Sequence, residues 1–148
     1  MPRKVLLLVV VLATAALALA GCREGEPGGA TGRVTVVEAP VGQTVAVPGE
    51  DLNVSFLQVL EDSRCPRDVT CVQAGRARVR VTLANSAGRL GDFELTVEAD
   101  NRSGNWVQAG DFSVRLAALQ PYPEQSMTNT PVPQRQYIAV VEVSRVEG

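Results

Sequence analysis

The sequence contains no histidine, and its single lysine, Lys4, lies close to the N-terminus. Without histidine the chain cannot form a Ser-His or Cys-His couple of the usual kind, and it has no imidazole to bind zinc or copper. Without a lysine in the body of the chain, enzymes that form a Schiff base are excluded as well. Asp, Glu and Tyr remain as candidate acids and bases. Because the sequence contains no GxSxG, phosphate-loop, dinucleotide-binding or HExxH motif, we expect no catalytic residues, no metal site and no cofactor.

Positive charge is not in excess either. Fourteen Lys and Arg residues stand against sixteen Asp and Glu residues, which gives a formal net charge of −2. Proteins that bind nucleic acid usually carry a basic patch or a surplus of Lys and Arg. Nucleic acid is therefore not an expected partner.

The first 21 residues have the pattern of a secretory signal peptide. Arg3 and Lys4 precede an apolar run from Val5 to Ala20, and small residues follow where cleavage is expected. An uncleaved transmembrane helix is the alternative. The run is shorter than the roughly 20 apolar residues that a spanning helix needs, so we favour the signal peptide.

The apolar run ends in Leu19-Ala20-Gly21-Cys22, which resembles the lipobox of bacterial lipoproteins. The resemblance implies that residues 1–21 are removed and that Cys22 becomes the first mature residue, with a diacylglyceryl thioether. Two or more acyl chains, such as palmitate, would hold the protein stably at a membrane. The resemblance thus implies a lipid-anchored protein of the bacterial cell envelope, facing the periplasm or the exterior.

The mature chain divides into a tether and one domain. Residues 22–32 form the lipidated N-terminus and a Gly-rich, charged stretch without branched apolar residues. Ten residues of such coil have a root-mean-square reach of about 16 to 19 Å. Residues 33–148 are of the usual size for a single domain.

This domain has the period-two pattern of β-strands. Ala77, Val79, Val81 and Leu83 alternate with polar residues, and residues 93–97 repeat the pattern. No segment shows a helical stripe. Seven or eight short strands predict an all-β, antiparallel β-sandwich of immunoglobulin-like type, with a small barrel as the alternative. The other expected strands are 34–37, 44–47, 52–60, 112–119 and 137–146.

Charged residues recur on the polar faces of two neighbouring predicted strands. Opposite charges across a hairpin contribute about 0.2 to 1 kcal/mol per pair. We expect a solvated ion-pair face, and a stripe that binds an anionic ligand is the alternative. The residues are Arg76, Arg78 and Arg80 on one strand and Asp92, Glu94 and Glu98 on the next.

Cys65 and Cys71 remain once Cys22 is assigned to the lipid. In an oxidising envelope this pair is expected to form a disulfide. A metal-binding pair is the alternative, but two thiolates without His or further Cys supply half a zinc site at best. Closing so short a loop is expected to stabilise the fold by about 2 to 2.5 kcal/mol.

The densest motif surrounds this cysteine pair and reads EDSRCPRDVTCVQAG over residues 61–75. Together with the 77–83 strand and the segment 121–123, it resembles an uncharacterised family of small bacterial secreted lipoproteins with an EDSRCPxxxxCVxAG core. That family often has Trp where Gln73 stands here, which weakens the idea of an aromatic platform. The resemblance brings no established activity.

The motif predicts a rigid crossover loop. Pro66 fixes one φ angle, Asp62 can accept backbone hydrogen bonds, and Arg64 can pair with Asp62 or Asp68. Two alternatives remain open. Asp62, Arg64 and Arg67 could bind a ligand or partner, or the loop 64–71 could present Arg64 or Arg67 to a protease as an inhibitor does.

A second irregular stretch, residues 120–136, carries four prolines and Tyr122. Long loops of this kind are often functional. We expect Tyr122 to pack as a lid on the sandwich, and binding is the alternative role. Tyr122 therefore joins Asp62, Arg64 and Arg67 as a candidate binding residue.

The function expected from the sequence is non-enzymatic. We expect a membrane-anchored envelope lipoprotein that binds or scaffolds another envelope component. One alternative is a protease inhibitor acting through the loop 64–71. A third hypothesis is a carboxylate-based hydrolase, which would need two acids facing one cleft.

Overall fold

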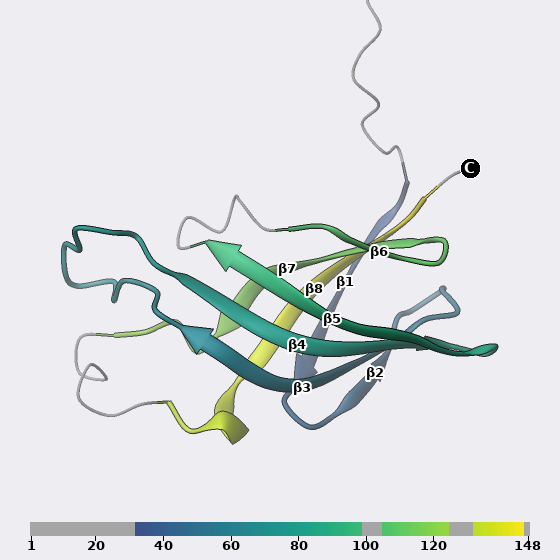
Figure 1. The fold of residues 1–148 in the computed structure, drawn as a ribbon, viewed down its shortest axis with the longest axis horizontal. Helices are drawn as coiled ribbons and strands as arrows, with labels where there is room; N and C mark the ends of the chain where they lie inside the picture. The colour runs from purple at the N-terminus through teal and green to yellow at the C-terminus, as the bar shows by residue number, and fades with distance from the viewer. Residues whose placement is uncertain (1–31, 99–104, 125–131, 147–148) are drawn as a thin grey trace, which may run out of the picture.

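The computed structural model describes residues 32–98, 105–124 and 132–146 and arranges them in two packed antiparallel sheets of four strands each (Figure 1). The signal peptide, Cys22 and nearly all of the predicted tether lie outside these residues. The prediction of an antiparallel β-sandwich is confirmed. Within the described part of the chain, no helix has the length and apolar character needed to cross a membrane.

One sheet is a run of consecutive hairpins, which we call the meander sheet. Its order is β2-β3-β4-β5, and all neighbours are antiparallel. The strands are β2 (Thr44–Ala46), β3 (Asn53–Asp62), β4 (Arg76–Asn85) and β5 (Gly88–Glu98).

The other sheet contains the first and last strands of the domain, and we call it the terminal sheet. Its order is β1-β8-β7-β6. The strands are β1 (Val34–Pro40), β6 (Val107–Ala109), β7 (Phe112–Gln120) and β8 (Ile138–Arg145). A 3₁₀ turn at Gln134–Gln136 precedes β8. The immunoglobulin-like prediction holds for the two-sheet architecture, whereas this strand order differs from the ABED and CFG sheets of immunoglobulin constant domains.

The core between the sheets is mainly aliphatic. Every second residue of β4 from Ala77 to Leu83 is fully buried, as the alternation predicts. Phe56 on β3 and Leu116 on β7 are also enclosed. The apolar surface buried here is the main stabilising term of the fold.

The observed strands end within three residues of the predicted ones, apart from two larger differences, at β5 and β6. β5 starts at Gly88, five residues before the predicted strand, because a register shift opposite Leu83 and Ala84 interrupts the alternation. Gly91 lies in this irregular part with a φ of 152°, and such a bulge hides the period-two pattern. The three-residue strand β6 was not predicted, since so short a strand leaves almost no periodic signal.

Side-chain amides cover two strand edges. β2 pairs with β3 only over residues 53–55. Further along this edge of β3, the amide of Gln134 accepts a hydrogen bond from Val59 N at 3.0 Å and donates one to Val59 O at 3.1 Å. At the outer edge of β5, the Asn105 amide accepts from Thr96 N at 2.6 Å and donates to Glu94 O at 3.0 Å. Each amide takes the place of a neighbouring strand and satisfies backbone groups that the sheet leaves open.

Candidate functional site

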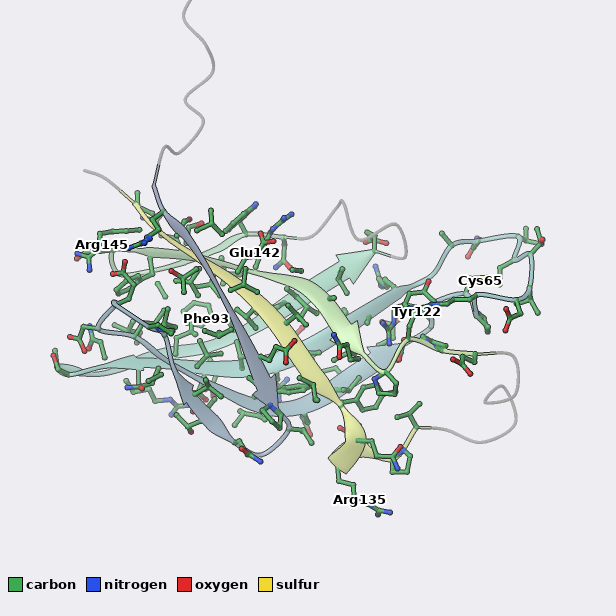
Figure 2. All side chains as sticks on the ribbon, turned by 180° about the vertical axis from the view of Figure 1, so that it is seen from behind. Cys65, Phe93, Tyr122, Arg135, Glu142 and Arg145 are labelled. Atoms are coloured by element: carbon green, nitrogen blue, oxygen red, sulfur yellow. A yellow bond between two sulfur atoms is a disulfide. The ribbon has the colours of Figure 1, made fainter. Side chains whose placement is uncertain are left out.

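The candidate site centres on the loop between β3 and β4, residues 63–75, which we call the disulfide loop. It projects at one end of the sandwich, beside Tyr122 (Figure 2). Cys65 and Cys71 form the predicted disulfide, with their Cα atoms 6.0 Å apart. Cys65 N also donates to Ala74 O at 3.1 Å, so the loop is closed by backbone as well as by sulfur.

The two ends of the loop are bound together where the strands stop. Ser63 N donates to Arg76 O at 2.8 Å, and Arg76 N donates to Ser63 Oγ at 3.2 Å. Gly75 has a φ of +71° and lies so close to Ser63 that a Cβ atom would stand 1.8 Å from its carbonyl oxygen. Glycine is therefore required at this position by both conformation and space.

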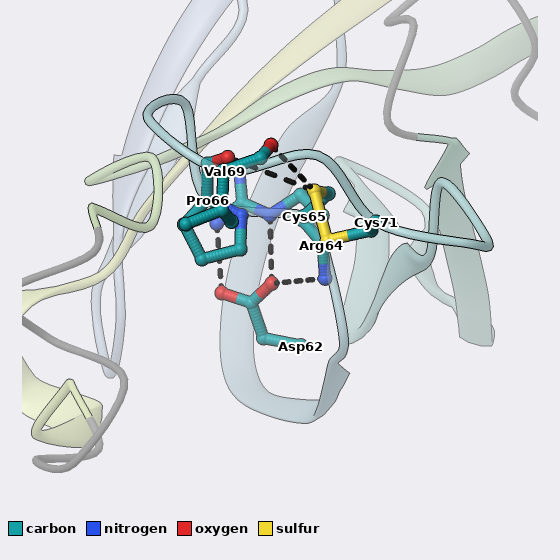
Figure 3. Close-up of a disulfide and its surroundings, with 6 residues drawn as sticks. All are labelled: Asp62, Arg64, Cys65, Pro66, Val69 and Cys71. Carbon is teal, nitrogen blue, oxygen red and sulfur yellow. Dashed lines mark hydrogen bonds and ion pairs between the residues drawn. A yellow bond between two sulfur atoms is a disulfide. The ribbon is translucent and has the colours of Figure 1, made fainter.

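Arg64 lies inside the molecule. Its side chain is 0% exposed, and that of Asp62 is 9% exposed. The guanidinium forms a two-pronged ion pair, with Nε donating to Asp62 Oδ1 at 2.7 Å and Nη2 donating to Oδ2 at 2.7 Å (Figure 3). Parallel bonds of this kind are among the strongest side-chain contacts in proteins. Of the two pairings that the sequence left open for Arg64, the structure has the one with Asp62.

The same guanidinium joins the meander sheet to the terminal sheet. Nη1 donates to Leu119 O at 2.5 Å, and Nη2 donates to Pro121 O at 3.0 Å. The ring of Tyr122 lies 4.9 Å from the Arg64 guanidinium carbon, which is the distance of a cation–π contact. Tyr122 thus packs over Arg64 at the edge of the core.

Tyr137 completes the network from the start of β8. Its hydroxyl donates to Asp62 Oδ2 at 3.1 Å. Burial raises the pKa of Tyr137 to about 12, and the negative charge of Asp62 and the hydrogen bond to it act in the same direction. The phenol therefore stays neutral and keeps donating to the carboxylate well above neutral pH.

This pKa predicts that the fold weakens at alkaline pH. The folded-state pKa of Tyr137 lies above its ordinary value of 10.0, so the stabilisation is complete below about pH 10 and is lost as the pH rises through 12. We expect the midpoint of urea unfolding to fall over this interval, and Tyr137→Phe to remove most of that fall.

The control for this prediction is Tyr122→Phe, because Tyr122 is the only other tyrosine in the chain. Absorbance of the tyrosinate in that variant then reports Tyr137 alone. A Tyr137 that ionises near pH 10 while the domain remains folded would contradict the assignment.

These contacts correct two readings of the motif. Asp62 and Arg64 were candidate binding residues. The structure shows instead that the carboxylate and the guanidinium form hydrogen bonds with each other and with other groups of the domain. Because its side chain is enclosed, Arg64 is not presented to a protease. If the loop acts as an inhibitor, the residue presented to the protease would have to be Arg67, which lies in a turn of the loop.

Arg67 is the exposed member of the predicted set. Its guanidinium carbon lies 5.0 Å from the ring centre of Tyr122, and its backbone N donates to Pro123 O at 3.3 Å. A hollow of about 280 Å³ opens beside these two side chains and is lined also by Arg64 and residues 118–121. The structure therefore brings Arg67 and Tyr122 together at one open surface.

The charged rows form the expected ion-pair face. Arg78 lies 3.0 Å from Glu61 and 3.7 Å from Glu94, and Arg80 lies 3.0 Å from Glu94. Glu61, at the end of β3, was not expected in this face. Because these guanidinium groups already have partners, the solvated ion-pair face is favoured over an anion-binding stripe.

A second hollow, of about 430 Å³, contains the pair of carboxylates that the hydrolase hypothesis requires. Glu61 and Glu98 line it, together with Arg76 and parts of the disulfide loop. A hydrogen bond from Ser63, with the charges of Arg76 and Arg78, lowers the pKa of Glu61 below its ordinary value. A lowered pKa keeps this carboxylate ionised, whereas a general acid needs a raised one.

The sequence did not point to Tyr137 or to the carbonyls of Leu119 and Pro121 as parts of this network, although Gly75 is the last residue of the motif. Tyr137 lies 75 residues from Asp62, and no local pattern joins the two. Gly75 did carry a weak signal, since glycine directly before a strand marks a turn with unusual backbone angles. Comparison with known protein families, curated proteins and solved structures found no match to this chain.

Proposed function

We propose that this protein is a non-enzymatic lipoprotein of the bacterial envelope, held at a membrane through lipidated Cys22, that binds another envelope component with its disulfide loop. The lipobox-like sequence before Cys22 supports the anchor, and the absence of histidine and of lysine after Lys4 supports a binding role. The single observation that carries the choice of surface is the position of the loop relative to the start of β1.

The start of β1, which directly follows the predicted tether in the sequence, and the disulfide loop lie at opposite ends of the domain. Val34, at the start of β1, pairs with Ser144, which pairs in turn with Ser113 at the beginning of β7. Arg64 in contrast bonds Leu119 at the other end of β7. Figures 1 and 2 show the start of β1 and the disulfide loop well separated along the long axis. A domain anchored by its N-terminus would therefore hold the loop away from the anchoring point.

The loop offers a rigid surface with both apolar and charged groups. Val72 is fully exposed on this loop and supplies the apolar group. Arg67 is exposed nearby in the sequence, with its guanidinium held against Tyr122. Because the disulfide and the Arg64 network already order the loop, little conformational entropy would be lost on binding.

Anchoring is tested with Cys22→Ser in the full chain. We expect the wild-type protein to incorporate an alkyne analogue of palmitate and to sediment with membranes. The Cys22→Ser variant should lose the label and keep the longer, unprocessed N-terminus. Label retained in Cys22→Ser would refute the anchor.

Partner binding is tested in the same membranes by placing a photo-crosslinking amino acid at Val72. The matched control is Ser86, which is exposed in the β4–β5 hairpin at the other end of the meander sheet. We expect a discrete adduct from position 72 that Arg67→Glu weakens, and none from position 86. Equal adducts from both positions, or none from position 72, would reject the loop as the binding surface.

A further inference from the structure

β1 is an edge strand that the domain leaves open. It is seven residues long and pairs with β8 on one side only. The edges of β3 and β5 are covered by the Gln134 and Asn105 amides, and β2 and β6 are only three residues long. Among the described residues, no side chain makes such a hydrogen bond to the backbone of β1. Proteins usually protect long edge strands against pairing with another chain.

The surroundings of β1 suit an added strand. A hollow of about 490 Å³ lies beside the strand and is lined by residues 33–36 together with Pro48 and Gly49. Val34 and Val36 point to the outer face and are 51% and 55% exposed. Exposed valines along an open edge favour the addition of a further β-strand.

We propose that β1 pairs antiparallel with β1 of a second copy of this chain, about a two-fold axis that passes through Thr35. The terminal sheets of the two copies then form one continuous sheet. The partner is a copy of the chain itself because β1 is complementary to itself in one particular register.

The register follows from which residues face the core. Side chains directly opposite each other in an antiparallel pair lie on the same face of the sheet. Val37 and Ala39 are buried, so odd-numbered residues of β1 must lie opposite odd-numbered residues of the second copy. With Thr35 opposite Thr35, each exposed Val34 meets an exposed Val36.

This register also avoids electrostatic conflict. Arg33 lies opposite Val37 of the second copy, and Glu38 lies opposite Gly32, so no two like charges face each other across the pair. The alternative with Val36 opposite Val36 would place Val34 against Glu38. The register centred on Thr35 is the one that pairs the four exposed valines with each other.

The tethers allow this arrangement at one membrane, and in this respect the inference rests on the proposed function. The two Gly32 residues are separated by about six strand residues, or about 20 Å. Each tether reaches about 16 to 19 Å, so both lipids can enter the same bilayer. Confinement to a membrane raises the effective concentration of the copies, which favours a small interface.

The test is cysteine cross-linking of the full chain in its membranes. In Thr35→Cys the two Cα atoms would be about 4.5 to 5.5 Å apart, within the range that a disulfide bridges. We expect a mild oxidant to convert most of the anchored protein to a covalent dimer on a non-reducing gel. Glu38→Cys is the matched control, because in this register the two positions 38 are about 20 Å apart.

A second variant keeps the test interpretable. It adds Val34→Lys and Val36→Lys to Thr35→Cys. Both valines are more than half exposed, so the domain should still fold, whereas the lysines should prevent the dimer from forming. Equal cross-linking at positions 35 and 38, no dimer at position 35, or an adduct of another mass there would each overturn the pairing. Palmitate labelling of the same sample shows separately whether the anchor has failed.

Discussion

Replacing Asp62 by alanine is expected to lower the free energy of unfolding by about 3 to 5 kcal/mol, because it leaves the enclosed Arg64 guanidinium without a counter-charge. In the same variant the Tyr137 hydroxyl loses its hydrogen-bond acceptor. Arg64, which bonds Leu119 on β7, is then no longer held in place by a carboxylate at the end of β3. The change is measured by urea denaturation followed by circular dichroism. For this domain such a loss is a large part of the total stability.

Arg80→Ala is the matched control for the buried pair. Arg80 also pairs with a carboxylate, that of Glu94, but both side chains are more than 40% exposed. Exposed ion pairs contribute at most about 1 kcal/mol. Similar losses in Asp62→Ala and Arg80→Ala would mean that the Arg64 site is hydrated and that its burial has no energetic consequence.

Arg64→Lys should not rescue the network. A lysine amine has one charged nitrogen, whereas Arg64 uses three nitrogens to reach Asp62, Leu119 and Pro121 at once. We therefore expect Arg64→Lys to be much less stable than the wild-type protein although the charge is kept. This distinguishes the geometric role of the guanidinium from its charge alone.

Gly75→Ala is expected to cost about 3 to 5 kcal/mol, from the left-handed backbone conformation and from overpacking. The added Cβ atom would stand 1.8 Å from the backbone oxygen of Ser63, a residue whose N–H donates a hydrogen bond to Arg76 O. Relief of the contact requires the ends of β3 and β4 to separate. Thermal and urea unfolding both report the loss.

Gly42→Ala separates the two causes. Gly42 has a φ of +77°, close to that of Gly75, but no atom lies within 4 Å of the Cβ position. Its substitution should therefore cost only the conformational part, about 1 to 2 kcal/mol. If Gly75→Ala and Gly42→Ala are equally destabilised, the close approach of Gly75 to Ser63 does not exist in solution.

The motif around the disulfide now has a structural explanation. Asp62 and Arg64 form the buried pair, Ser63 links the strand ends, and Gly75 permits the close approach. These residues build the junction between the sheets, so any partner must be bound by what remains exposed. For that reason the proposed binding surface consists of Arg67 and Val72, with Tyr122 as support.

Part of this site could be predicted from the sequence because its determinants are close together in the chain. Cys65 and Cys71 are six residues apart and were the remaining pair, and Asp62 and Arg64 are separated by a single residue. The exposed role of Arg67 could not be distinguished in advance from the buried role of Arg64. Both are arginines of one loop, and only the position of Leu119 and Pro121 distinguishes them.

The sequence by itself determined that the domain is all-β, since the alternation of apolar and polar residues depends only on the two faces of each strand. The prediction of the disulfide likewise needed only the cysteine count and the compartment expected from the N-terminal sequence. The tertiary structure alone decided the strand order, and with it the meeting of Asp62 and Tyr137 and the open edge of β1. Period-two patterning records which face of a strand is buried, but it carries no information about which strand lies alongside.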